Sequence, residues 1–81
     1  MSNAISHGTP DAFREYIHEM AAMAAIQAEL VMKYAEIGDD IGLVYATRRW
    51  VAYTRAAVGT VKDLNSMKEQ AEGAHHAGEH Q

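Results

Sequence analysis

Glu15 and His18 form the first pair in this chain whose spacing could support chemistry. A Glu-x-x-His step places a carboxylate and an imidazole on one face of a helix, and di-metal bundles use two such steps with two further inward-facing glutamates. After Glu36, however, no glutamate occurs before Glu69. Because that ligand set would be incomplete, we predict a solvated helix face here, with no metal and no other cofactor.

Other reactive groups lie near the ends of the chain. His75, His76 and His80 could bind a divalent metal loosely, as flexible imidazoles do, and this indicates no function. Cysteine is absent, the serines are terminal or near a helix end, and no glycine-rich phosphate loop occurs. We therefore predict that the protein is not an enzyme.

Arg48, Arg55 and Lys62 recur at seven-residue intervals, with Arg49 beside them. On a helix they make a basic strip about 20 Å long that could meet phosphates of a nucleic acid. Alternatively they face solvent or pair with acids on a neighbouring helix. The net charge of −4 favours the second interpretation and argues against nucleic acid as the partner.

Two helices must position these residues. Thr9, Pro10 and Asp11 make a good helix start. Positions that are apolar except for Gln27 then recur at alternating spacings of three and four up to Ile37, at Phe13, Tyr16, Met20, Met23, Gln27, Leu30, Tyr34 and Ile37, with Ile17, Ala24 and Val31 beside them. Gly38 suits a left-handed helix end, and Asp39 or Asp40 can cap a second helix from Ile41 to about Gln70. A hairpin is favoured over one continuous helix.

The second helix carries more apolar surface than one neighbour covers. Leu43, Trp50, Ala57 and Leu64 share one line of the helix, and Ala46, Tyr53, Thr60 and Met67 share the next. Val44, Val51 and Val58 lie about 100° further round. The residues predicted to form an interface are Leu43, Val44, Trp50, Val51, Tyr53, Val58, Val61 and Leu64.

Two features of these helices have two interpretations each. Ala52, Ala56 and Gly59 are either a strip of small residues that lets another backbone come close or an ordinary weak point of the helix. Gln27 either sets the register of a helical assembly from a buried position or lies at the edge of the bundle and points to water.

The predicted fold is all-α: an antiparallel helical hairpin at 9–72, between a flexible arm at 1–8 and a disordered, histidine-containing tail at 73–81. A chain this small, without disulfides, usually relies on helix packing or self-association. Residues 9–40 carry a net charge of −5 and residues 41–72 a net charge of +2, which favours antiparallel pairing. We expect two hairpins to complete a four-helix bundle as a homodimer.

Localisation follows from what the sequence lacks. Charges interrupt every apolar window long enough to cross a membrane, and the start lacks the basic-then-apolar pattern of a secretory signal. We therefore expect a cytoplasmic protein with no membrane contact.

Residues 53–62, YTRAAVGTVK, resemble part of the C-terminal helix of secretion needle and inner-rod subunits. The resemblance implies a structural subunit of a helical polymer. The turn lacks the proline and asparagine common in that family, and the polar tail differs from an end that those proteins pack inside the polymer. Our first hypothesis is a non-enzymatic interaction module, a small dimeric adaptor, regulator or chaperone-like partner that binds itself or another protein helix. A polymer subunit is second, and a nucleic-acid-binding bundle is third.

Overall fold

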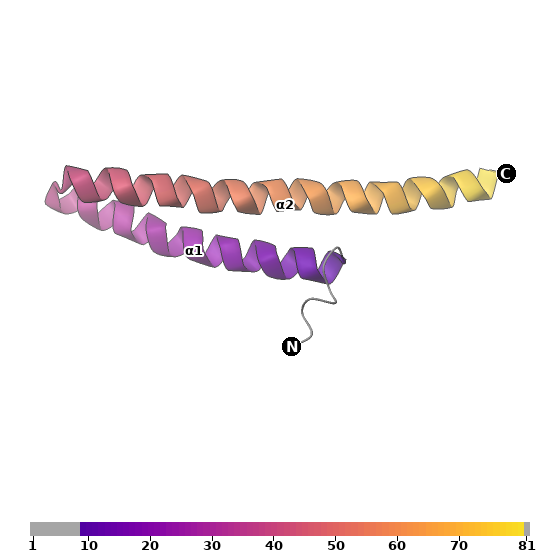
Figure 1. Ribbon diagram of the computed structural model, residues 1–81, viewed down its shortest axis with the longest axis horizontal. Coiled ribbons are helices and arrows are strands. Elements are labelled where there is room, and N and C mark those ends of the chain that lie inside the picture. The colour runs from indigo at the N-terminus through magenta and orange to yellow at the C-terminus, as the bar shows by residue number, and fades with distance from the viewer. Residues whose placement is uncertain (1–8, 81) are drawn as a thin grey trace.

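The computed structural model describes the backbone of residues 9–80 and the side chains of residues 9–73. Within that part the chain forms two helices and no strand, α1 (Pro10–Ile37) and α2 (Asp40–His80). The helices lie side by side and antiparallel (Figure 1). The prediction of an all-α hairpin, and not of one continuous helix, is confirmed. The predicted arm at 1–8 lies outside the described residues.

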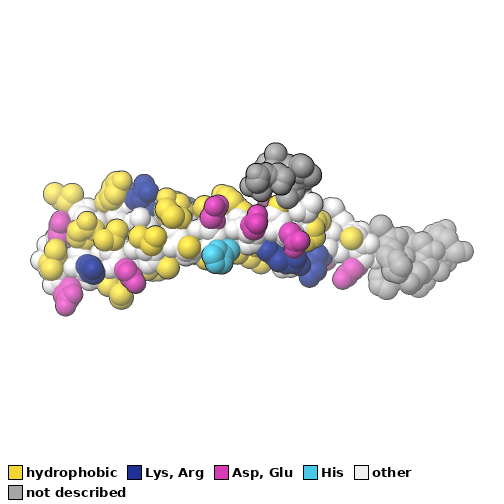
Figure 2. Space-filling model, turned by 90° about the horizontal axis from the view of Figure 1, so that it is seen from below, with side chains coloured by type: hydrophobic (Ala, Val, Ile, Leu, Met, Phe, Trp, Pro, Cys, Tyr) yellow, Lys and Arg dark blue, Asp and Glu magenta, His cyan; other side chains and the backbone are white. Residues whose placement is uncertain are grey.

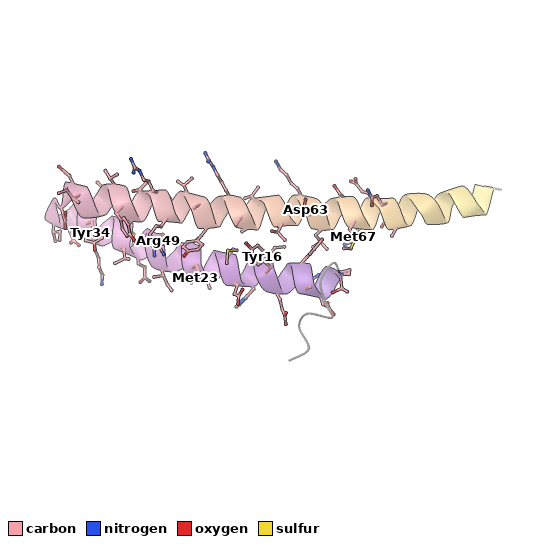
Figure 3. The ribbon with its side chains drawn as sticks, in the orientation of Figure 1. Tyr16, Met23, Tyr34, Arg49, Asp63 and Met67 are labelled. Atoms are coloured by element: carbon pink, nitrogen blue, oxygen red, sulfur yellow. The ribbon has the colours of Figure 1, made fainter. Side chains whose placement is uncertain are left out.

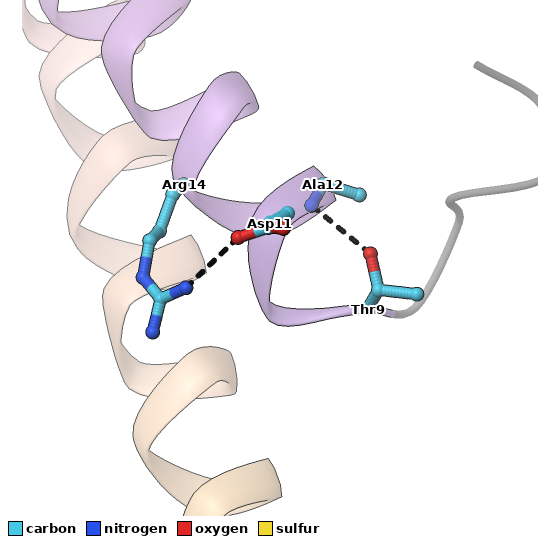
Figure 4. Close-up of polar contacts among 4 residues, drawn as sticks. All are labelled: Thr9, Asp11, Ala12 and Arg14. Carbon is cyan, nitrogen blue, oxygen red and sulfur yellow. Dashed lines mark hydrogen bonds and ion pairs between the residues drawn. The ribbon is translucent and has the colours of Figure 1, made fainter. Parts of the chain in front are cut away.

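The start of α1 is fixed by side chains near Thr9. The Thr9 backbone is extended, with φ −92° and ψ 156°, and its Oγ1 accepts a hydrogen bond of 3.1 Å from the N–H of Ala12 (Figure 4). Pro10 follows as the first helical residue, where it has no N–H to leave unpaired. Asp11, in the positive field of the helix start, accepts a hydrogen bond of 3.1 Å from Arg14.

The turn consists of two residues that satisfy the ends of both helices. Gly38 adopts a left-handed conformation with φ +76°, which an L side chain would strain. Its N–H donates to the carbonyl of Ala35 at 3.3 Å, and the N–H of Asp39 donates to that of Tyr34 at 3.0 Å. This is the Schellman arrangement. Asp39 Oδ1 then accepts from the N–H of Gly42 at 3.0 Å, so Asp39 and not Asp40 caps α2.

The second helix is longer than the sequence pattern predicted. It has 41 residues against 28 in α1, and it continues well beyond the start of α1 (Figure 1). The predicted end near Gln70 is corrected to His80. Residues 68–72 are all good helix formers, and Gly73 and Gly78 weaken a helix without ending it. The tail predicted at 73–81 therefore continues as helix to residue 80, and Gln81 lies outside the described residues.

The contact between the helices is narrow. Ala24 and Ala46 are the buried apolar residues of the described part, and no large side chain there is fully buried. Gln27 is also buried, with 8% of its surface exposed. On α1, the residues that face α2 are shifted around the helix axis from the predicted line toward Ile17, Ala24 and Val31. Tyr16 and Ile37, predicted on that line, are 44% and 72% exposed.

Next to the turn the two helices touch closely. A Cβ added to Gly42 would lie 2.7 Å from the ring of Tyr34, so that ring rests directly on the α2 backbone. Further from the turn, Met23 and Met67 point into the space between the helices (Figure 3). The hairpin is thus joined along one strip of each helix, which leaves the rest of both surfaces to the surroundings.

Candidate interaction surface

Two sides of α2 differ in how much α1 covers them. The side toward α1 carries buried or half-buried residues at the two predicted lines: Leu43, Ala46, Tyr53, Ala57, Thr60, Leu64 and Met67. Their spacings of three and four match the 3.6-residue turn of the helix. Of the residues predicted to form an interface, Leu43, Tyr53 and Leu64 therefore lie against α1 within one chain.

The other predicted interface residues remain accessible. We call this surface the outer face of α2 and define it by Val44, Trp50, Val51, Val58 and Val61, all exposed. Val44 and Val58 are each 50% exposed, and Val51 is 38% exposed. Trp50, predicted on the line toward α1, lies at its edge and is 40% exposed. Five large apolar side chains on one helix surface are more than solubility favours, and such patches commonly mark interaction sites.

The outer face is not flat. Trp50, Val51, Thr54 and Arg55 line an open depression of about 240 Å³ with an apolar lining. These four residues lie on two successive turns of α2. An open apolar depression of this size can accept an apolar side chain from another helix.

A line of alanines on α1 continues this surface. Ala21, Ala28 and Ala35 recur every seven residues, and Ala21 and Ala35 are exposed. At 100° per residue in two antiparallel helices, this line and the outer face of α2 lie on the same side of the hairpin. Large side chains on α2 thus stand beside small ones on α1.

A second apolar patch, the turn patch, consists of the exposed side chains of Ile37 and Ile41, which flank the turn. Ile26 and Tyr45 are exposed as well. In Figure 2, where α1 is nearer the viewer, apolar side chains gather over the half of the molecule that contains the turn, and acidic side chains are spread along its length. The chain therefore exposes apolar side chains at the turn as well as on the outer face of α2.

Arg49 does not belong to the exposed basic strip. Its guanidinium carbon lies 5.6 Å from the ring centroids of both Tyr45 and Tyr53, and Nη2 donates to the Tyr53 hydroxyl at 3.1 Å. These contacts hold the cation over two aromatic faces and leave it half-buried. The sequence analysis missed this cluster, although tyrosines four residues before and after an arginine are its signal.

Arg48, Arg55 and Lys62 are exposed, as predicted for a strip along α2. The acids of α1, among them Glu15, Glu29 and Glu36, are exposed as well. Within residues 9–73 no ion pair joins the two helices, so the interpretation in which the strip pairs with acids of its own first helix is not supported. Both sets of charges remain available to a partner.

The candidate metal-ligating residues of the sequence do not come together in the described part of the structure. Glu15 and His18 are both exposed on α1, and among the residues with described side chains no three acidic or histidine groups come together to hold a metal ion. The side chains of His75, His76 and His80 lie outside the described part.

Gly59 is exposed with nothing within 4 Å of an added Cβ, so α1 makes no close approach to the small-residue strip.

Comparison with family models, with curated proteins and with solved structures finds no match for this chain. Over the described residues, neither helix contains a stretch that is both long and apolar enough to cross a membrane.

Proposed function

We propose that this chain is a non-enzymatic protein–protein interaction module, a small adaptor or regulator that works through the outer face of α2. In this proposal two copies pair through that face and complete a four-helix bundle. Packing two hairpins together removes the outer faces from water, which is the usual way for a short chain without disulfides to gain a core.

One observation carries the proposal. No large apolar side chain of the described residues is fully buried, while Val44, Val51 and Val58 stand in line on one surface. Covering the exposed half of such a valine contributes about 1 kcal/mol. A helix with matching apolar spacing would contact all three at once, since they recur every second turn. The same face could exchange the second copy for an amphipathic helix of another protein, which is how such a module would act as an adaptor.

A structural subunit of a helical polymer is the second candidate, and the patch near the turn favours it. Ile37 and Ile41 are exposed at the end of the hairpin that contains the turn. If the outer face of one copy bound the turn patch of the next, the contact would be heterologous and the assembly would not close. The two candidates differ in mass, because a closed dimer has a fixed mass and a polymer grows.

Light scattering over a concentration series tests the proposal. We expect the wild-type mass to level off at twice the chain mass of 8.9 kDa. Val51→Asp, which places a charge on the outer face, should raise the dissociation constant by about a hundredfold. Ala52→Asp adds the same charge at the next residue, which is exposed but points about 100° away, and should leave the mass unchanged. A mass that stays at one chain at all concentrations would reject self-association, and continuous growth would favour the polymer.

A further inference from the structure

The exposed charges of the two helices follow matching patterns. Arg48, Arg55 and Lys62 recur every seven residues on α2, and on α1 a line at the same spacing contains Glu15, Ala22, Glu29 and Glu36. All the charged members are exposed, and none pairs across the hairpin within residues 9–73. Two charged lines of opposite sign and equal period are complementary to each other.

Each line borders an apolar surface. Arg48, Arg55 and Lys62 follow Val44, Val51 and Val58 by four residues, so the basic line runs along the far edge of the outer face. On α1, Glu29 and Glu36 come directly after Ala28 and Ala35, so the acidic line runs along the far edge of the alanine line. A helix pair that buries the valines against the alanines would place the two charged lines together at its solvent edge.

Two closed arrangements could cover the outer face with a second copy. If α2 packs against α2 of the second copy, the two basic lines meet, and like charges oppose association. If α2 packs against α1 of the second copy, the basic line meets the acidic line. We propose the second arrangement, with a twofold axis parallel to the helices and both turns at the same end. It rests on the self-association proposed above and specifies which helix of the partner the outer face receives.

The register of the hairpin identifies the pairs. A twofold axis along the helices keeps every residue at its own height, so α2 meets the second copy's α1 at the register it has with its own α1. Gly42 lies level with Tyr34 in that register. Counting one residue back on α1 for each residue forward on α2 brings Arg48 within about one residue of Glu29, and Lys62 within about one residue of Glu15. Both cations thus meet a glutamate of the second copy.

The apolar side chains agree with the same register. By this count Trp50 lies level with residue 26 of the second copy, between Ala25 and Ala28. Two alanines leave room for the indole, whereas a large side chain at either position would prevent close approach. The bulkiest residue of the outer face therefore meets the smallest part of α1.

A charge-exchange experiment tests the arrangement. One variant carries Arg48→Glu and Lys62→Glu, and the other carries Glu15→Lys and Glu29→Lys. Each variant alone would place like charges in contact at both helix pairs, and we expect its dissociation constant to rise at least tenfold at low salt. An equimolar mixture should form mainly the mixed dimer in native mass spectrometry, since all contacts are then between opposite charges. A chain with all four changes restores the complementarity and should pair with itself as the wild type does.

The outcomes separate this inference from the proposed function. If both variants self-associate like the wild type and mix in the statistical 1:2:1 ratio, the α2–α1 arrangement is wrong while self-association stands. If each variant self-associates like the wild type while their mixture associates more tightly than the wild type, α2 packs against α2, because like charges already meet in that arrangement in the wild type. If the wild type does not associate at any concentration, both the inference and the proposed function fail.

Discussion

The two sides of α2 are both largely apolar, but their surroundings differ. Leu43, Ala46, Tyr53 and Leu64 are covered by α1, whereas Val44, Val51 and Val58 on the same helix are exposed. One helix of 28 residues covers a single strip of its partner. The second apolar side of α2 therefore does not stabilise the fold of one chain, and its apolar residues need another explanation.

The comparison predicts that a charge on the covered side of α2 lowers the free energy of unfolding far more than a charge elsewhere on α2. Ala46 is completely buried, so Ala46→Asp would force a carboxylate into the contact with α1 and should lower the free energy of unfolding by several kcal/mol. Ala52→Asp carries the same loss of helix propensity at an exposed position and should cost about 0.5 kcal/mol. Urea unfolding followed by circular dichroism at fixed protein concentration measures both. Equal effects would mean that α1 does not cover Ala46 in solution.

Replacing two glycines of α2 by alanine should change stability by smaller amounts, and the two changes should have opposite signs. Gly42→Ala would place a Cβ 2.7 Å from the Tyr34 ring, and the resulting overpacking should destabilise the hairpin by about 1 kcal/mol or more. Gly59→Ala meets open space and removes a weak helix position, so it should stabilise by about 0.5–1 kcal/mol. Thermal unfolding of both variants checks the signs. If Gly59→Ala instead weakens self-association, the small-residue strip and not the outer face receives the second copy.

The helices and their ends could be predicted from the sequence because local chemistry determines them. Thr9 with Pro10, and Gly38 with Asp39, are residue types whose backbone preferences start and end helices, and the structure uses them as predicted. The end of α2 was placed too early. Glycines at 73 and 78 suggested a break, but each costs only about 1 kcal/mol relative to alanine and does not prevent the helix from continuing.

The surface was harder to predict than the helices. Spacing correctly identified a wide apolar arc, but it could not decide which part α1 would cover. A rotation of a few tens of degrees leaves Tyr16 and Ile37 exposed and places Trp50 at the edge. Sequence spacing alone places Arg49 beside the basic strip, whereas in the structure its guanidinium lies over the rings of Tyr45 and Tyr53. Side-chain contacts of this kind depend on helix rotation, which a repeating pattern defines only approximately.

Trp50 provides the most direct measurement of whether a second copy covers the outer face. It is the single tryptophan of the chain, and in one hairpin it is 40% exposed. The account predicts that its fluorescence maximum moves to shorter wavelength as protein concentration rises, in step with the doubling of mass. An emission maximum that stays constant while the mass doubles would place the contact elsewhere on the molecule and contradict the account.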